Sequence, residues 1–157
     1  MNRILVSMQE GLSEPEWFNK VQEFESLVLQ KLGYDGEEIS ILFCNDDFIK
    51  DLNSRFRNID KETDILSFEN GEEYEDEEGK WLCIGDMIIS LETLPKNAEY
   101  FNVTQNEELK RLLIHGTLHL NGMDHGEAHI ESGSKVEDEM LCLQEQILCQ
   151  VSDFNFF

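Results

Sequence analysis

The sequence predicts a single compact domain that contains both helices and strands. Its 157 residues, 40% of them hydrophobic, suit one ordinary domain with one shared core. Short apolar runs of strand length alternate with longer segments in which apolar residues recur at three- and four-residue steps, the spacing of an amphipathic helix. No internal repeat, low-complexity tract or linker divides the chain. We therefore expect one domain over residues 1–157.

Four short runs, rich in isoleucine, leucine, valine and phenylalanine, have the length and composition of β-strands. They are expected at 3–8, 38–44, 64–68 and 82–90. An acidic, glycine-containing segment at 70–79 separates the third run from the fourth. Its composition is typical of a solvated loop.

Five longer segments carry apolar residues at helical spacing. They are expected at 13–32, 45–56, 92–101, 104–120 and 134–151. Ser13 and Pro15 are suited to the N-cap and first turn of the first helix. Asn45 is a good cap for the second helix, and Thr104 with Glu107 has the spacing of a capping box. The C-terminal aromatic residues 154–157 are expected to pack on the core, the alternative being contact with a partner.

The formal charge of −22 makes non-specific binding to nucleic acid or to anionic membranes unfavourable over most of the surface. Seven of the acidic residues lie between Glu69 and Glu78. A polyanionic substrate therefore needs a region of local positive charge, and residues 50–61 provide one. They contain Lys50, Arg55, Arg57 and Lys61 against two aspartates, for a local charge of +2.

The chain lacks the features of a membrane or secreted protein. No stretch approaches the roughly 18 apolar residues of a membrane span, and the apolar run at 3–8 is too short for a signal peptide.

The four cysteines, Cys44, Cys83, Cys142 and Cys149, form no CxxC pair, so neither a disulfide framework nor a thiolate zinc site is indicated. We expect a soluble cytoplasmic protein whose cysteines are small core residues.

Three of the four histidines, His115, His119 and His125, fall within eleven residues. Residues four apart on a helix share a face, so His115 and His119 can meet one ion. Gly122 can adopt a left-handed conformation that ends the helix and brings His125 to the same ion. Three neutral imidazoles suit one Zn²⁺ and leave its fourth position open for water, as in catalytic rather than structural zinc sites. The sequence therefore predicts a catalytic metal centre.

The alternative is that these histidines belong to a polar helix end and bind no metal. The spacing of the three histidines also matches the metzincin peptidases, but those enzymes need glutamate directly after the first histidine as general base. Gly116 occupies that position here, which argues against proteolysis. His129 lies outside the pattern and is expected to be an exposed residue.

The histidine block 115–125, HGTLHLNGMDH, closely resembles the signature of the YbeY-type endoribonuclease family, metal-dependent factors of ribosomal RNA maturation. Residues 52–57, 63–68 and 85–90 resemble the remaining motifs of that family in order and spacing. The resemblance covers most of the chain, from about Ile39 to the last helix. Met123 stands where an aromatic residue is common, and Glu69 where proline is common.

The resemblance implies an α+β fold with a small mixed sheet of four strands, about five helices and a zincin-like metal helix. It implies one Zn²⁺ on His115, His119 and His125, and single-strand-specific RNA cleavage in rRNA maturation and ribosome quality control. It also carries Arg57 over as the functional arginine, which makes Arg57 and His115 the catalytic candidates. Residues 1–157 would then form a single metal-dependent endoribonuclease domain.

Physical reasoning gives Arg57 independent support, because a guanidinium can grip a phosphate through two hydrogen bonds and stabilise charge that develops on phosphorus. Lys50, Arg55 and Lys61 are candidates for further phosphate contacts. The alternative for Arg57 is a surface ion pair with one of the many carboxylates.

Several aspartates near these motifs have two interpretations each. Asp64, with Ser67, either orients a loop or caps a turn, and Asp86 is equally ambiguous. Asp124 either accepts a hydrogen bond from a ligand histidine or acts as base for the metal-bound water.

Three functions compete. The first is metal-assisted hydrolysis of single-stranded rRNA, with water or the ribose 2′-hydroxyl as nucleophile. The second is a metal-dependent peptidase or amide hydrolase. The third is a non-catalytic assembly factor with structural zinc, whose acidic surface docks the ribosomal subunit through basic ribosomal proteins.

Overall fold

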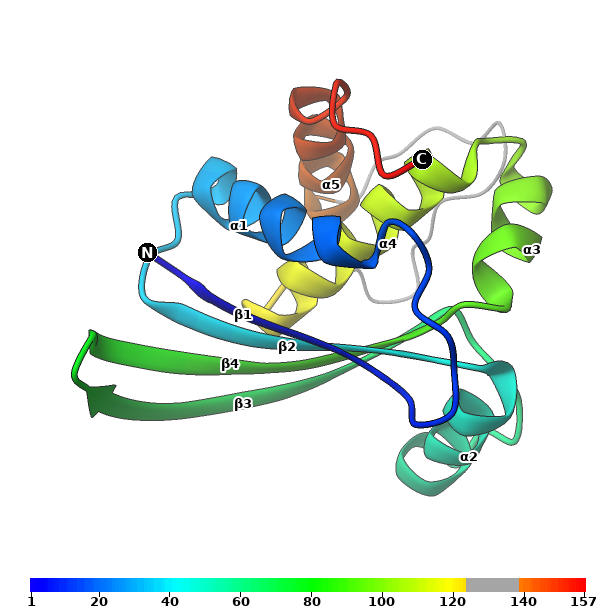
Figure 1. The fold of residues 1–157 in the computed structure, drawn as a ribbon, viewed down its shortest axis with the longest axis horizontal. Coiled ribbons are helices and arrows are strands. Elements are labelled where there is room, and N and C mark those ends of the chain that lie inside the picture. The colour runs from blue at the N-terminus through cyan, green and yellow to red at the C-terminus, as the bar shows by residue number, and fades with distance from the viewer. Residues whose placement is uncertain (124–138) are drawn as a thin grey trace.

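The computed structural model describes residues 1–123 and 139–157 and is built around one four-stranded sheet (Figure 1). The strands are β1 (Arg3–Met8), β2 (Glu37–Cys44), β3 (Ile65–Asp76) and β4 (Gly79–Ser90). Their order in the sheet is β1-β2-β4-β3. β2 runs parallel to both β1 and β4, whereas β3 is antiparallel to β4. The sheet is therefore mixed, which confirms the predicted α+β fold.

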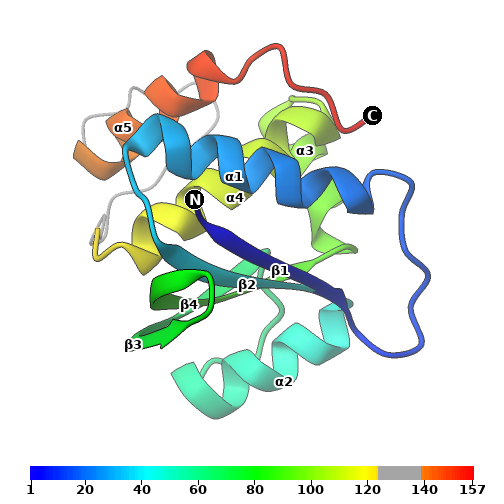
Figure 2. The same cartoon turned by 60° about the vertical axis from the view of Figure 1, so that its left-hand side comes forward.

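Helices cover both faces of this sheet unequally. The helices are η1 (Phe18–Lys20, a 3-10 turn), α1 (Val21–Leu32), α2 (Asp46–Arg57), α3 (Thr93–Phe101), α4 (Gln105–Leu120) and α5 (Glu139–Gln150). Figures 1 and 2 both show α2 on one side of the sheet and the other α-helices on the opposite side. The main core lies between the sheet and α1, α4 and α5, and a smaller cluster lies under α2. Within the described ranges, none of these helices is long and apolar enough to cross a membrane.

Local signals placed two of the helix starts correctly. The Asn45 side chain accepts a hydrogen bond from the Phe48 N–H at 2.9 Å, and Thr104 accepts one from the Glu107 N–H at 3.1 Å. These side chains satisfy N–H groups that the first helical turn leaves unpaired. The predicted caps of α2 and α4 are thus confirmed.

The first helix begins later than predicted. Ser13 and Pro15 precede it, and α1 starts only at Val21 after the 3-10 turn. Trp17 is buried and packs edge-on against Phe43 of β2, with ring centroids 5.3 Å apart. This tertiary contact fixes the path of the chain ahead of the helix and overrides the local helix signal.

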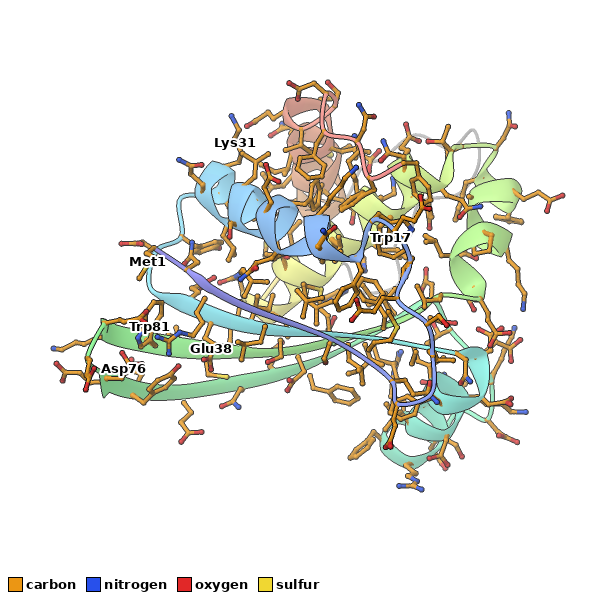
Figure 3. All side chains as sticks on the ribbon, viewed as in Figure 1. Met1, Trp17, Lys31, Glu38, Asp76 and Trp81 are labelled. Carbon is orange, nitrogen blue, oxygen red and sulfur yellow. The ribbon has the colours of Figure 1, made fainter. Side chains whose placement is uncertain are left out.

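The prediction of a solvated loop at 70–79 was wrong, because β3 and β4 continue through it as a paired hairpin up to Asp76 and Gly79. Arg3 of β1 holds this extension in place. Its guanidinium donates to Asp76 at 2.8 Å and lies 4.1 Å from the ring centroid of Trp81, and Trp81 and Asp76 lie at the end of the sheet that carries the hairpin turn (Figure 3). These cross-strand contacts offset the low strand propensity of the acidic residues.

The prediction that all four cysteines are core residues was also wrong. Cys44 is buried, Cys83 and Cys142 are partly exposed, and Cys149 is exposed. Cys149 directly follows Ile147 and Leu148, which belong to the buried face of α5, and the helical period turns it outward.

Two of the three C-terminal aromatic residues, Phe154 and Phe156, pack on the core as predicted, whereas Phe157 is 61% exposed. Phe156 is 3% exposed and lies 5.1 Å from the ring of Phe24 in α1. The buried ammonium of Lys110 in α4 donates to the carbonyl oxygens of Val151 and Phe154 at 3.1 and 3.0 Å. The end of the chain is therefore fastened to the helix that carries two of the candidate ligands.

Gly85 marks the point where the hairpin departs from the rest of the sheet. It pairs with Ile39 and Glu69 at positions where both strand pairings shift register. Its φ is +139°, and a Cβ there would overlap the carbonyl oxygen of Phe68. Only glycine tolerates both conditions.

Gly85→Ala is expected to lower the free energy of unfolding by about 3 kcal/mol, because it adds backbone strain and a steric clash. Gly79→Ala is the matched control: its φ is +134°, but no heavy atom lies within 4 Å of the added Cβ. That variant should lose about 1 kcal/mol from strain alone. Urea unfolding measures the free energy of unfolding of both variants. Equal losses in Gly85→Ala and Gly79→Ala would contradict the assigned clash.

Candidate metal centre and active site

The helix α4 brings His115 and His119 together. Their ring centroids are 4.5 Å apart, and their Nε2 atoms are separated by 3.0 Å. Gly122 has a φ of +88°, the left-handed conformation predicted for the turn after the helix. His125, Asp124 and His129 lie outside the described residues, so the predicted third ligand stays a prediction.

Hydrogen bonds define which nitrogen of each imidazole carries the proton. Nδ1 of His115 lies 2.6 Å from Oε1 of Gln144, and Nδ1 of His119 lies 3.1 Å from the carbonyl oxygen of Met123. Both oxygens can only accept, so each Nδ1 carries hydrogen and donates. The amide of Gln144 is oriented by its own Nε2, which donates to Glu145 at 3.1 Å. In the neutral imidazoles, the lone pairs are therefore on the two Nε2 atoms.

The arrangement of the two Nε2 atoms suits a metal ion. Two lone pairs 3.0 Å apart repel one another unless a proton or a cation lies between them. Nitrogen ligands at about 2.0–2.1 Å from a tetrahedral zinc are separated by about 3.3 Å, close to the observed spacing. Within residues 1–123 and 139–157, no group of three His, Cys, Asp or Glu residues could hold a metal ion. The described part of the site thus fits two of the three ligands.

A series of hydrogen bonds orients the imidazole of His115. Gln144 of α5 is 2% exposed and accepts the His115 hydrogen bond. Its neighbour Glu145 receives two hydrogen bonds from Arg111 of α4, at 3.0 and 2.9 Å. Such outer contacts fix the orientation of a metal-binding histidine. Sequence reasoning missed them, although a glutamine within the apolar face of the last predicted helix was an available signal.

For the zinc site predicted from the sequence, Gln144→Leu is expected to weaken zinc binding by about 10- to 100-fold, because it removes the acceptor that orients His115. Gln144→Glu keeps an acceptor oxygen and should stay close to the wild-type affinity. The control is Gln146→Leu, an exposed position on the same helix. Competition with a chelator measures the dissociation constants, and a Gln144→Leu affinity within twofold of wild type would contradict the assigned role.

Gly116 packs against the sheet. A Cβ at this position would overlap the Met87 side chain of β4 and lie 2.9 Å from Cδ1 of Ile65 in β3. A glutamate here would therefore be directed into the contact between α4 and the sheet. The close approach gives a physical reason for the glycine and supports the argument against a peptidase base at this position.

A cleft of about 650 Å³ lies beside the histidine pair. It is lined by Phe56, Arg57, Thr63, Asp64, Ile65, Leu66, Ser67, Phe68, Glu69, His115 and His119. The last turn of α2, the start of β3 and the exposed face of α4 therefore meet at one site. Arg57, predicted from sequence to act with the histidines, shares this cleft with them.

The surroundings of Arg57 differ from those of the other basic residues nearby. Among the residues that the structure describes, no carboxylate lies within ion-pair distance of Arg57, whereas Arg55 pairs with Asp51 at 3.1 Å. Lys50, Arg55 and Lys61 do not line the cleft. The ion-pair alternative for Arg57 thus has no support in the described residues, and its guanidinium is available to an anion.

Asp64 holds the turn that precedes β3. Its carboxylate accepts hydrogen bonds from the Ile65 N–H at 2.8 Å and from Nδ2 of Asn97 in α3 at 2.9 Å. Burial raises the pKa of Asp64. The side chain both caps the turn and ties it to α3, so it fixes the wall of the cleft. Asp86 is exposed on β4 and does not line the cleft.

A buried acid supports α4 between the two histidines. Oγ1 of Thr117 lies 2.7 Å from both carboxyl oxygens of Glu25 and from the carbonyl oxygen of Leu113. The hydroxyl has one hydrogen, which it can give to Leu113, so a protonated Glu25 supplies the other hydrogen bond. Burial raises the pKa of Glu25 to about 8.

Glu25→Gln is expected to flatten the pH dependence of stability. The folded protein keeps the Glu25 proton up to about pH 8, whereas the unfolded chain loses it near 4.5. Wild-type stability therefore falls as pH rises between these values, by about 1.4 kcal/mol per pH unit from this group. The variant should gain stability relative to wild type at pH 8. Urea unfolding at several pH values tests this against Glu23→Gln, an exposed control on α1; matching pH profiles for both variants would contradict it.

Comparisons of the sequence with known proteins agree on one family. A family model described as Endoribonuclease YbeY matches residues 6–152. The Endoribonuclease YbeY of Treponema denticola is 50% identical over 139 residues, which cover 88% of this chain and 86% of the relative. That of Aquifex aeolicus is 34% identical over 151 residues, covering 96% and 93%. The solution structure of TM1509 from Thermotoga maritima matches with a TM-score of 0.60 and 29% identity, covering 98% of this chain and 90% of that one. The chain therefore belongs to the endoribonuclease YbeY family.

Proposed function

We propose that this chain is a zinc-dependent, single-strand-specific endoribonuclease that acts in rRNA maturation and ribosome quality control. Family membership supports a nuclease of the hydrolase class with RNA as substrate. The observation that carries the finer proposal is the position of Arg57 beside His115 and His119 in one cleft. A cation-binding pair and a free guanidinium are the two elements that phosphoryl transfer needs.

In this proposal His115, His119 and His125 hold one zinc ion. When bound, zinc supplies a Lewis acid that polarises a phosphoryl oxygen and lowers the pKa of a bound water. Gln144 and the Met123 carbonyl keep both described imidazoles in the tautomer that leaves Nε2 for the metal. Asp124 stays a candidate partner for a ligand histidine or a candidate base.

Arg57 binds the phosphate. Two of its N–H groups can donate to two non-bridging oxygens at once and stabilise the charge that grows on them in the transition state. Asn53 supports this end of α2, because its buried amide donates to the carbonyl oxygen of Lys61 at 2.9 Å. Lys50, Arg55 and Lys61 lie outside the cleft lining and are proposed only as outer phosphate contacts.

The acidic hairpin supports a ribosomal partner. β3 between Glu69 and Asp76 carries exposed carboxylates on an edge strand of the sheet. A basic ribosomal protein would complement this charge and bring the acidic chain to its RNA. The proposed partners are therefore the ribosomal subunit and its basic proteins, and the proposed place of action is the cytoplasm.

Cleavage of labelled single-stranded and duplex RNA of the same sequence tests the proposal. Zinc-loaded protein should cleave the single strand, and chelator-treated protein should not. A cyclic phosphate at the product end would assign the ribose 2′-hydroxyl as nucleophile. Equal cleavage of the duplex, or undiminished cleavage without metal, would contradict the proposal. A zinc-loaded protein that cleaves no RNA would favour the non-catalytic assembly factor.

A further inference from the structure

Phe56 is an exposed aromatic residue at the cleft. It is 66% exposed, and among the large exposed hydrophobic residues that the structure describes it is the one that lines the 650 Å³ cleft. A single exposed apolar side chain needs no explanation by itself. The position of Phe56, however, needs an explanation. Phe56 directly precedes Arg57 in the last turn of α2 and lines the same cleft as the histidine pair.

Phe68 holds the Phe56 ring in place. The two ring centroids are 5.4 Å apart with an interplanar angle of 69°, a favourable edge-to-face contact. Phe68 is itself partly buried against the small core cluster that includes Leu66 and Ile88. Phe56 is thus supported from one side while most of its surface stays open to solvent.

A single-stranded nucleic acid presents the complementary chemistry. Each of its phosphates is flanked by bases whose faces are free, and an aromatic side chain binds such a face with little regard to sequence. In a duplex those faces are covered by neighbouring base pairs. A guanidinium for the phosphate with an adjacent open ring is therefore a combination that favours an unpaired strand.

We propose that Phe56, supported by Phe68, is a nucleobase-stacking subsite that takes a base next to the phosphate bound by Arg57. This inference rests on the proposed function and adds the contact that selects single strands. The ring stacks on the face of any of the bases. Because Arg57 binds the phosphate, the stacked base is one that adjoins that phosphate.

The test is binding of a labelled single-stranded oligodeoxynucleotide, which keeps phosphates and bases but lacks the 2′-hydroxyl that distinguishes RNA. Zinc-loaded protein is titrated at low salt and binding is followed by anisotropy. Phe56→Ala should weaken binding about tenfold, within the range for loss of one stacked base, and Phe56→Trp should retain it. Tyr100→Ala is the matched control, since Tyr100 is 68% exposed on α3 and does not line the cleft.

A series of oligonucleotides with one abasic position separates stacking from a structural effect. Wild-type protein should lose about tenfold in affinity when the stacked base is missing, and Phe56→Ala should lose nothing further. The inference is overturned if wild-type protein does not bind the strand, or if both proteins respond equally at every abasic position. Failure to cleave RNA while this difference persists would instead overturn the proposed function and leave the subsite standing.

Discussion

Arg57→Ala is expected to lower kcat/KM for cleavage of single-stranded RNA by about 10²- to 10³-fold, the effect of removing one donor to a developing anion. The guanidinium shares the cleft with His115 and His119 and has no carboxylate partner among the described residues. Zinc binding should be unchanged, because no expected ligand is altered. Cleavage kinetics and zinc content, measured on the same preparation, check both statements.

Two neighbouring variants make this result specific. Arg57→Lys keeps the charge but loses the two-point contact, and should recover only part of the rate. Arg55→Ala removes only a proposed outer phosphate contact, which is paired with Asp51 and lies outside the cleft lining, so it should cost no more than about fivefold, far less than Arg57→Ala. Similar losses for Arg55→Ala and Arg57→Ala would point to a general charge effect and contradict a specific role.

His119→Ala is expected to abolish both zinc retention and cleavage. It leaves at most two of the three proposed ligands, and loss of the metal removes several kcal/mol of transition-state stabilisation, which is about 10³-fold or more in rate. The rate should equal that of chelator-treated wild-type protein. Metal analysis after dialysis and a cleavage assay measure the two losses.

The fold should survive that substitution. α4 is anchored elsewhere, by the close approach of Gly116 to the sheet and by the Thr117 contact with Glu25, so the helical circular dichroism signal should be unchanged. His129→Ala is the control, because His129 lies outside the predicted motif. A His119→Ala protein that keeps zinc and cleaves normally would remove His119 from the metal site.

Local sequence signals predicted most of the fold. Short apolar runs located the four strands and helical spacings located the helices, and Asn45 and Thr104 marked two helix starts because capping is a contact between near neighbours. The errors came from distant contacts. The 70–79 hairpin depends on Arg3, more than sixty residues earlier, and the late start of α1 depends on Trp17 packing against Phe43.

In the candidate site, too, features that depend on near neighbours in the sequence could be predicted, and features that depend on distant contacts could not. The four-residue spacing of His115 and His119 determines their shared face, and the structure places Arg57 in the cleft beside them. Gln144 could not be connected to His115 from sequence, since their contact joins α4 and α5 across 29 positions. Phe56 has the spacing of the apolar stripe of its helix, yet it is exposed, because α2 ends there beyond the edge of its small core cluster.

The most direct test of the central claim is a zinc titration of metal-free protein, with bound metal and cleavage of single-stranded RNA measured on the same samples. Cleavage should rise in proportion to bound zinc and saturate at one equivalent, and Arg57→Ala should bind that equivalent without regaining the rate. Metal-free protein that cleaves at the full rate, or wild-type protein that cleaves no RNA with one zinc bound, would contradict the claim.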